Sequence, residues 1–395
     1  MTKKVLIITP RFPLPDIGAD EKDRFEGIKQ LRRLGFDVRV IAKVFSFQDK
    51  EAINRFSVGS GIPVTLLEYE NKFSIKKLLN PFYWDGAAYE YSRKSTKKTV
   101  EVILDEWHPD LLWVDYTYLW PLYGLARKRN IPIITRSINF EPSHFLQEDG
   151  RSVVNFVKFL PKLASELMAI KKSNFIFSIT PNEERTYKRL GAKNVAVLPL
   201  RGLSVCLDKR SFVHERETLK VIFMGSTYNV RHNRAAIEAI LKDIAPSVRE
   251  KCPGQLKFYV SGSKIPEDFK RFFGEDVIYA GRKDQREFDD FLADMDIAVV
   301  PSLFGAGMQQ KIFEPLCRGI PAVVSSRGLV GYPFRHREHA LIANGLEEFP
   351  DLLLELRDRD LRRKLSENSV SLSKKLFSRE KMDDAVLEAV NKISR

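Results

Sequence analysis

The sequence predicts an α/β protein with two doubly wound, Rossmann-like domains that face each other across a cleft. Short apolar, β-branched runs alternate with amphipathic helical stretches along the chain, which is typical of parallel sheets with crossover helices. These runs form two successive series of about 200 residues each, a usual size for one such domain. In each series the first strand leads into a loop that carries a glycine, Gly18 or Gly225.

A strand is expected wherever a short apolar run is bounded by turn or polar residues. The first series has such runs at Val5–Ile8, Asp37–Val44, Pro63–Leu67, Leu111–Val114, Ile131–Thr135, Phe175–Ile179 and Val195–Leu198. The second series has them at Leu219–Met224, Leu256–Val260, Val277–Ala280, Ile297–Val300 and Ala322–Ser325. A helix over Asp20–Leu34, ended by Gly35, follows the first strand and its proline-rich loop. The tail Asp351–Arg395 has a charged, helical pattern.

The change from one series to the next predicts a domain boundary near Pro199–Val213. We expect an N-terminal domain over residues 1–203, a C-terminal domain over 204–375, and a final helix over 376–395 that packs back on the N-terminal domain. In doubly wound sheets, ligands bind beyond the carboxyl ends of the strands. Two facing sheets therefore predict a ligand site in the cleft between the domains.

The charge balance favours anionic partners. Among the 395 residues, 65 are Lys or Arg and 52 are Asp or Glu, which gives a formal net charge of +13. Such an excess favours nucleic acid, acidic lipid headgroups or phosphorylated substrates. Nucleic acid is not an expected partner, because the sequence has no zinc-finger, RNA-recognition or helix-turn-helix signature.

The cysteines and the N-terminus indicate a reduced, cytoplasmic protein. Cys206, Cys252 and Cys317 are odd in number and far apart, so neither a disulfide framework nor a metal site is expected. No secretory signal follows Met1, and no apolar run approaches the roughly 18 residues of a membrane-spanning helix. Hydride transfer from a dinucleotide and phosphoryl transfer by a P-loop are also disfavoured, because both glycine fingerprints are absent.

Residues 296–331 carry the most chemical information. They have the pattern of a strand, a glycine loop, a helix and a second strand. Gly305 and Gly307 would let the backbone approach a ligand closely, and the helix that follows would present free N–H groups to a phosphate. Lys311 and Glu314 lie three residues apart on one helix face, where a cation suits a diphosphate and a carboxylate can accept two ribose hydroxyls. The alternative is a surface Lys–Glu pair.

The whole segment resembles the nucleotide-sugar site of the GT-B glycosyltransferases, in particular family 4, the glycosyl transferases group 1. The matching residues are Val300-Pro301, Gly305, Gly307, Lys311, Glu314 and Gly319 to Val324. Four further segments resemble the family in the same order along the chain: Arg136 to Glu141, Ser178 to Glu183, Phe223 to Ser226 with Tyr228 and Asn233, and Tyr279 to Arg282.

The resemblance implies a role for each matching residue. Glu314 would hold the ribose, and Gly305, Gly307 and Lys311 would lie near the diphosphate or the sugar. The remaining donor-binding residues would be Gly18 in a loop over the diphosphate, Gly225 and Ser226 at the opening of the second domain, Arg231 as a phosphate partner, and Arg282 beside the base. Asn139 and Glu141 would orient the sugar or the acceptor.

The resemblance also implies the reaction. The N-terminal domain would hold a glycan or lipid-linked acceptor, and the C-terminal domain a nucleotide-diphosphate sugar as the donor substrate. Transfer would retain configuration and need no cofactor or metal, because the leaving diphosphate takes the acceptor proton. Lys311, Glu314, Asn139 and Glu141 are the predicted catalytic residues.

Two departures from the family pattern leave other functions open. Ala306 stands where many members have a second glutamate, and Ile138 stands where they have a histidine. A catalytically degenerate binding or scaffold subunit would explain both departures. A nucleotide-sugar epimerase of the same fold is the third alternative. It is disfavoured because it would need histidines in the cleft, and a second family histidine, after the fourth strand, is also missing where Asp115 to Tyr118 stand.

Two aromatic, basic stretches raise a further possibility about partners. One spans Lys72–Trp84, and the other, Arg151–Lys172, holds five basic residues against Glu166. Apolar residues recur at helical spacing in the second stretch, although Pro161 is expected to interrupt or begin a helix there. Such a stretch suits either a packed helix with a solvated basic face or peripheral contact with an anionic membrane, here at the inner membrane face.

Overall fold

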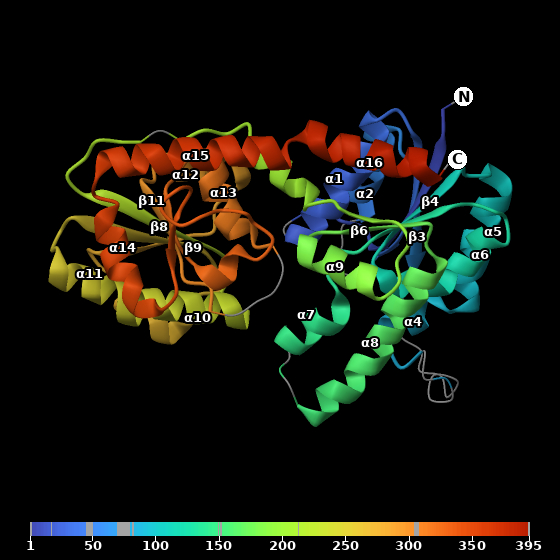
Figure 1. Cartoon of the computed structure of the whole chain (residues 1–395), viewed down its shortest axis with the longest axis horizontal. Coiled ribbons are helices and arrows are strands. Elements are labelled where there is room, and N and C mark those ends of the chain that lie inside the picture. Colours follow the sequence, from blue (N-terminus) through green and yellow to red (C-terminus); the bar gives the residue numbers. More distant parts are fainter. Residues whose placement is uncertain are drawn as a thin grey trace. The chain divides into compact units, whose positions relative to one another are not determined.

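The computed structural model describes residues 2–16, 18–44, 50–68, 80, 83–148, 150, 152–211, 213–303 and 308–393. The chain divides into two compact units (Figure 1). Unit 1 comprises Met1–Gly202 together with Arg379–Arg395, and unit 2 comprises Leu203–Ser378.

Unit 1 is built on a seven-stranded parallel sheet in the order β3-β2-β1-β4-β5-β6-β7. Its strands are β1 (Lys4–Arg11), β2 (Asp37–Val44), β3 (Val64–Glu68), β4 (Leu111–Asp115), β5 (Ile133–Arg136), β6 (Phe175–Ser178) and β7 (Val195–Val197). The chain first adds strands on one side of β1 and then returns to add β4 on the other. This reversal creates the switch point at which doubly wound sheets bind ligands.

Helices cover both faces of this sheet. They are α1 (Ala19–Arg33), α2 (Lys50–Ser60), α4 (Gly86–Tyr91), α5 (Lys94–Trp107), α6 (Tyr123–Arg127), α7 (Glu141–Glu148), α8 (Val153–Lys172), α9 (Pro181–Arg189) and α16 (Arg379–Ile393), with the 3-10 helix η2 (Thr117–Leu122). On one face, Leu6, Ile8 and Val114 pack against apolar side chains of α5, η2 and α6, such as Leu104 and Leu122. On the other, α1 buries Phe25, Ile28 and Leu31.

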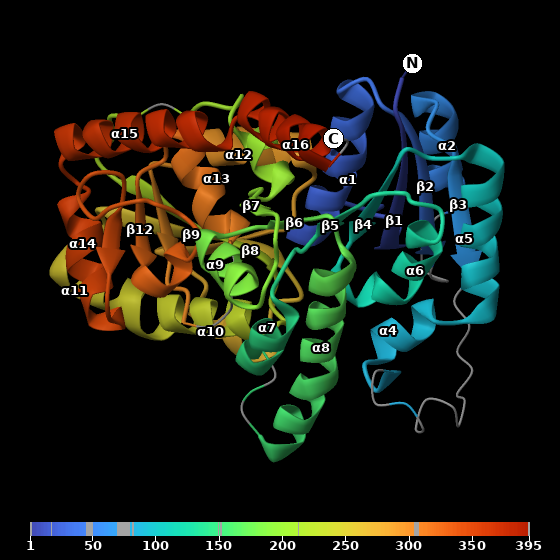
Figure 2. The ribbon, with the colours of Figure 1, turned by 45° about the vertical axis from the view of Figure 1, so that its right-hand side comes forward.

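The last helix of the chain, α16, packs beside α1 within unit 1 (Figure 2). Asp383 of α16 accepts a hydrogen bond of 2.8 Å from the Gln30 side chain and pairs with Arg33 at 2.9 Å. The buried residues Met382, Val386 and Val390 recur along α16 at helical spacing. The chain terminus therefore belongs to the core of unit 1.

Unit 2 repeats the same topology with a six-stranded parallel sheet in the order β10-β9-β8-β11-β12-β13. Its strands are β8 (Leu219–Thr227), β9 (Leu256–Ser263), β10 (Val277–Gly281), β11 (Ile297–Val300), β12 (Ala322–Ser325) and β13 (Leu341–Ala343). Its helices are α10 (Arg231–Ala239), α11 (Ala245–Lys251), α12 (Gln285–Ala293), α13 (Gln310–Arg318), α14 (Phe349–Glu355) and α15 (Arg359–Phe377). Helices α10 and α11 lie on one side of the sheet, and α12, α13 and α15 lie on the other (Figures 1 and 2).

The predicted α/β class and the two doubly wound parallel sheets are confirmed. The cleft predicted between the domains stays a prediction. Two details differ from the sequence prediction. Strand β13 was not predicted, because its three residues are too few to show a pattern. Pro161 does not interrupt or begin a helix, since α8 runs through it and loses only the one backbone hydrogen bond that proline cannot donate.

A fully buried ion cluster ties together three parts of unit 1. The Asp23 carboxylate of α1 lies 3.0 Å from Arg136 at the end of β5 and 2.9 Å from Arg201, and it also accepts a 2.7 Å hydrogen bond from the Arg201 backbone N–H. Burial alone would raise the pKa of Asp23, but the two guanidiniums hold it well below its ordinary value. Arg136, which opens the family-like motif 136–141, is thus part of the core.

Substitution of Asp23 by Asn should destabilise unit 1 by about 3–5 kcal/mol, because two buried guanidiniums lose their counter-ion. Urea unfolding followed by tryptophan fluorescence measures this effect, since all four tryptophans lie between residues 84 and 120. The control is Asp105→Asn, which removes a bidentate but exposed pair with Arg129 and should barely move the midpoint. Equal midpoints for the two variants would contradict the assignment.

Candidate functional site

The carboxyl edge of the sheet in unit 2 collects most of the predicted donor-binding residues. Strand β8 ends in Gly225 and Ser226, and β11, its neighbour across the switch point, leads toward α13 with Lys311 and Glu314. All six strands are parallel, so their carboxyl ends share one edge. Residues that lie far apart in the sequence are thereby brought to one place.

Gly225 is required by close packing. A Cβ atom placed there would lie 2.4 Å from the hydroxyl oxygen of Tyr228. The Tyr228 side chain is fully buried, and its hydroxyl donates a 2.5 Å hydrogen bond to the backbone carbonyl of Ser261 on β9. The glycine thus lets a buried tyrosine lock the turn after β8 onto the neighbouring strand.

Asn233 of α10 joins this turn to α13. Its amide nitrogen donates to the Ser226 hydroxyl at 3.2 Å and to the Thr227 carbonyl at 3.0 Å. Its amide oxygen accepts a hydrogen bond of 3.1 Å from the Lys311 ammonium. Because Asn233 is buried, it fixes the position of Lys311 relative to Ser226.

Lys311 is a half-buried cation with no carboxylate partner among the described residues. Its Nζ lies over the Phe223 ring, 5.8 Å from the centroid, and no Asp or Glu of the described residues forms an ion pair with it. Burial lowers the pKa of Lys311 to about 8. A cation withdrawn from water without a counter-ion is the kind of group that an anionic ligand stabilises.

Glu314, one turn further along α13, is held by Arg318. The Glu314 carboxylate lies 2.5 Å from the Arg318 guanidinium and accepts a longer hydrogen bond of 3.4 Å from Gln310. Arg318 also pairs with Asp289 at 2.7 Å. A carboxylate offers about four lone-pair sites, so these partners leave acceptor capacity for further donors such as ribose hydroxyls.

Four of the remaining predicted donor-binding positions are less well defined. Arg231 is an exposed residue at the start of α10, and Arg282 is exposed directly after β10 at the same edge of the sheet. Neither is joined to Lys311 or Glu314 by a hydrogen bond among the contacts described. Gly305 and Gly307, and the departure at Ala306, lie outside the described residues.

The other predicted residues belong to unit 1. Gly18 precedes α1, and its carbonyl accepts the first helical hydrogen bond, from Lys22. Asn139 and Glu141 follow β5, and Glu141 is the first residue of α7. Ile138, where many family members have a histidine, is buried.

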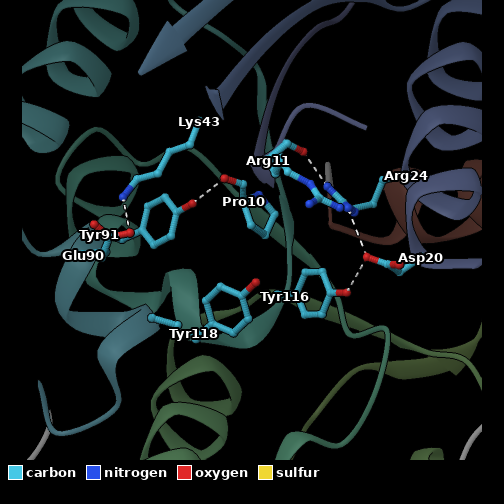
Figure 3. Close-up of a pocket in the computed structure, with 10 residues that line it drawn as sticks. Pro10, Arg11, Asp20, Arg24, Lys43, Glu90, Tyr91, Tyr116 and Tyr118 are labelled. Carbon is cyan, nitrogen blue, oxygen red and sulfur yellow. Dashed lines mark hydrogen bonds and ion pairs between the residues drawn. The ribbon is translucent and has the colours of Figure 1, made fainter. Parts of the chain in front are cut away.

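A pocket of about 260 Å³ lies in unit 1 at the carboxyl ends of β1 and β2 (Figure 3). It is lined by Pro10, Arg11, Asp20, Arg24, Lys43, Ala87, Glu90, Tyr91, Tyr116 and Tyr118. The charges around it are compensated: Lys43 pairs with Glu90 at 2.7 Å, and Arg24 with Asp20 at 3.1 Å. Such a pocket offers hydrogen-bonding groups and aromatic faces rather than net charge, which suits a ligand with many hydroxyls.

Tyr116 has an unusual backbone conformation at this pocket. Its φ of 72° is rarely adopted by residues other than glycine. The conformation stacks its ring on Tyr118, with centroids 5.1 Å apart, and lets its hydroxyl donate to Asp20 at 3.3 Å. Strain of this kind is often kept where it positions a functional side chain.

Two glutamates with raised pKa values lie beside this region. Burial raises the pKa of Glu141 to about 7, and the neighbouring charges of Asp20 and Glu183 add to the shift. Glu166 of α8 is fully buried and has a pKa raised to about 8 by burial. It accepts hydrogen bonds from the Thr117 hydroxyl, the Tyr187 hydroxyl and the Glu141 backbone N–H, at 2.9, 2.7 and 3.1 Å.

Several residues of both sites were missed by sequence reasoning. The missed residues are Asn233 as a link to Lys311, Arg318, Asp20, Tyr116 and Tyr118. Asn233 and Arg318 act through partners that only the fold brings near, so the sequence carries no signal for them. A signal for the tyrosines was present, because Tyr116 and Tyr118 directly follow the fourth strand at its carboxyl end.

Comparison with known proteins gives a family match within the second unit. Residues 218–358 match the family described as Glycosyl transferases group 1. No curated protein matches the chain. The matched range contains Gly225, Ser226, Asn233, Lys311 and Glu314, so the resemblance inferred from these residues is confirmed there.

Solved structures show the same fold over the whole chain. Sucrose-phosphate synthase from Thermosynechococcus elongatus has a TM-score of 0.70 at 13% identity, and 99% of each chain is covered. TarM has a TM-score of 0.71 at 11% identity, again with 99% of each chain covered. HepE from Anabaena, crystallised with UDP and glucose, has a TM-score of 0.65 at 13% identity and covers 99% of this chain and 100% of its own. The chain thus has the GT-B fold, and residues 218–358 resemble the glycosyl transferases group 1.

The buried Glu166 should make the stability of unit 1 depend on pH. Its pKa is higher in the folded state, about 8, than its ordinary value. The stability that its protonated form contributes is therefore present at low pH and lost as the pH rises toward 8. Urea unfolding by tryptophan fluorescence should show a midpoint that falls between pH 5 and pH 8, and Glu166→Gln should flatten this slope.

In the Glu166→Gln variant the urea midpoint should still fall with rising pH, but less steeply. Glu141 causes this remaining dependence, because its pKa is also raised. The control is Glu184→Gln on the outer turn of α9, where the carboxylate pairs only with Lys188 in the ion pairs described. This variant should keep the full pH dependence. An unchanged slope in Glu166→Gln would show that Glu166 is ionised in the folded protein at neutral pH.

Proposed function

We propose that the protein is a glycosyltransferase that moves a sugar from a nucleotide-diphosphate sugar to a glycan or a lipid-linked acceptor, with retention of configuration and without a metal. The donor binds at the carboxyl edge of unit 2, and the acceptor binds in the pocket of unit 1. The match of residues 218–358 to the glycosyl transferases group 1 supports the enzyme class.

The observation that carries the proposal is Lys311, a half-buried ammonium held by Asn233 and without a carboxylate partner in the part of the chain that the structure describes. A diphosphate supplies the missing negative charge. The ammonium also stabilises the charge that develops on the leaving diphosphate, which lowers the energy of the transition state. The position and the charge of the Lys311 ammonium therefore suit a reaction in which a nucleoside diphosphate leaves.

Glu314 binds the ribose of the donor through its free acceptor positions, while Arg318 keeps its carboxylate oriented. Gly225 and Ser226 border the same site from β8. Arg231 and Arg282, and the glycines at 305 and 307, complete the proposed donor site. Uridine diphosphate is the first donor moiety to test, because HepE, a protein of the same fold, was crystallised with UDP-glucose.

The reaction needs positioning and electrostatic stabilisation more than a strong base. A hydroxyl oxygen of the acceptor forms a bond to the anomeric carbon of the sugar. The bond from that carbon to the diphosphate oxygen breaks, and its electron pair leaves with the nucleoside diphosphate. The acceptor proton passes to the departing diphosphate, so no further reactant is required.

The acceptor half of the proposal rests on the pocket in Figure 3. Tyr116 and Tyr118 offer stacked rings to a sugar face, and Asp20 offers a carboxylate to its hydroxyls. Asn139 and Glu141 orient the sugar or the acceptor. Glu141 is well suited to this task, because a pKa of about 7 lets its carboxyl group accept or donate a hydrogen bond near neutral pH.

The location of the protein is also part of the proposal. A lipid-linked acceptor would place the enzyme in the cytoplasm, in peripheral contact with the inner membrane face. In the part of the chain that the structure describes, no helix combines the length and the apolar character needed to cross a bilayer.

Two variants of unit 2 test the donor site. Lys311→Met and Glu314→Ala should each weaken the binding of uridine diphosphate by about tenfold to a hundredfold in calorimetry, because each removes a charged hydrogen-bonding partner. Affinity of the natural protein should also fall as the pH rises above about 8, where Lys311 loses its proton, and Lys311→Met should lack this fall. Lys242→Met, which breaks only a surface pair with Glu238, should bind normally.

If Lys311→Met and Glu314→Ala bind uridine diphosphate as tightly as Lys242→Met and the natural protein do, the donor site lies elsewhere. If uridine diphosphate fails to bind the natural protein, guanosine diphosphate and adenosine diphosphate are tested next, since the base is not specified by Lys311 or Glu314.

A catalytically degenerate subunit is distinguished by incubation with a panel of nucleotide sugars. Slow release of free nucleoside diphosphate supports the enzyme, whereas tight binding without release supports the scaffold.

A further inference from the structure

We propose that α8 docks unit 1 on a lipid bilayer that carries anionic headgroups, by laying an apolar face of the helix into the headgroup layer. The inference deepens the proposed function, on which it rests for the idea that the acceptor is lipid-linked. It assigns the contact to named residues of one helix and to one kind of partner.

The outward side of α8 exposes an unusual amount of apolar surface. Val153 is 82% exposed, Phe156 51%, Val157 54% and Leu160 63%. With Val154 and Leu167, these residues form what we call the apolar stripe. In the described part of the chain, twelve large apolar side chains are exposed, and six of them belong to this one helix. Exposed apolar residues are ordinary when scattered, but a cluster of this kind marks an interaction site.

The stripe follows the helical repeat. Val153, Phe156, Val157 and Leu160 stand at positions i, i+3, i+4 and i+7, and Leu167 lies two turns further on the same side. At 1.5 Å per residue, the fifteen residues from Val153 to Leu167 span about 22 Å. The stripe is therefore one continuous face, long enough for a helix that lies in the plane of a membrane surface.

The opposite side of α8 is buried, and it includes the polar residues Ser165 and Glu166 beside Pro161 and Ala169. Ser165 bonds to Trp120 at 3.2 Å and to Asp85 at 3.1 Å, while Glu166 bonds to Thr117 and Tyr187. These polar contacts fix the rotation of the helix about its axis. The apolar stripe therefore cannot turn inward without breaking a buried hydrogen-bond network.

The first turns of α8 also project away from the sheet of unit 1, as both ribbon views show (Figures 1 and 2). Residues from Val153 to Leu160 are exposed or half-buried, and full burial begins only at Pro161. A projecting apolar end can enter a headgroup layer without disturbing the packed core of the unit.

Charge decides in favour of a lipid surface over a second protein copy. The exposed charged residues of α8 are Lys158 and Lys171, and its acidic residue, Glu166, is completely buried. Lys171 stands eighteen residues, or five turns, after Val153 and so lies on the side of the stripe, where a cation attracts anionic headgroups. Two copies that met through this face would instead bring like charges together. The net charge of +13 acts in the same direction.

Co-sedimentation with vesicles tests the proposal. At low salt, the full chain should sediment with vesicles of phosphatidylglycerol and phosphatidylcholine. The double variant Phe156→Ser, Val157→Ser should lose at least about tenfold in partitioning, because two large apolar side chains leave the interface. The matched control, Val58→Ser, changes an equally apolar side chain that is 78% exposed on α2, and it should bind like the natural protein.

A second measurement separates insertion from adsorption of charge. Phe156→Trp keeps the apolar stripe and should show a blue shift of its fluorescence when the vesicles are added. Lys171→Glu should weaken binding to anionic vesicles while the stripe is intact. Binding that is equal for the natural protein and the Phe156→Ser, Val157→Ser variant would overturn the proposal, and so would the absence of any blue shift.

The outcomes also separate this inference from the proposed function. Calorimetry with uridine diphosphate should be unchanged in the Phe156→Ser, Val157→Ser variant, since both residues lie in unit 1. Conversely, Lys311→Met should lose the nucleotide and keep vesicle binding. A natural protein that ignores vesicles but forms dimers abolished by Phe156→Ser, Val157→Ser would assign the stripe to a second copy and reject the lipid partner.

Discussion

The Asp23 carboxylate is the constraint on which the architecture of unit 1 depends. Two guanidiniums and one backbone N–H converge on it, and they come from two residues far apart in the chain, Arg136 and Arg201. Because none of these charges reaches water, the three parts are fixed together: α1 with its N-terminal Gly18 and Asp20, the end of β5, and the segment at Arg201. Three of the residues proposed to meet the acceptor are carried on these elements: Asp20 on α1, and Asn139 and Glu141 after β5. Core stability and site geometry therefore depend on the same buried charges.

The buried cation of unit 2 differs from those of unit 1 in its partners. Arg136 in unit 1 has its counter-ion, but Lys311 in unit 2 has only a neutral amide partner among the described residues. The burial that lowers the pKa of Lys311 is a cost to the folded protein. A ligand that brings negative charge removes this cost, and binding to the folded state alone stabilises that state. The buried charges of unit 1 are compensated within the unit, whereas the buried cation of unit 2 would be compensated by the proposed nucleotide.

The sequence predicted the sheets well because each parallel strand is buried on both faces and shows as an apolar run, as at Val5–Ile8 or Ile297–Val300. It also predicted Lys311 and Glu314 on one helix face, since their spacing is local. It could not predict that Arg318 would hold Glu314 or that Asn233 would hold Lys311, because these partners meet only through tertiary packing. For Arg136 the sequence was misleading. Its motif, residues 136–141, suggested a place in the ligand site, but the side chain is fully buried in the core of unit 1.

Ala306 and Ile138 depart from the family pattern and raise the alternative of a degenerate subunit. The surroundings of the residues that are retained, such as Lys311, are a better test of this alternative than the missing residues are. A subunit that had lost its ligand would gain stability by pairing or removing a buried ammonium, since nothing else would compensate its desolvation. Lys311 is instead held in place by a buried asparagine that is itself fixed on β8. Tyr116 likewise keeps a strained backbone at the edge of a polar pocket. Two separate unfavourable arrangements, each at a predicted ligand site, favour the proposed enzyme over a degenerate subunit.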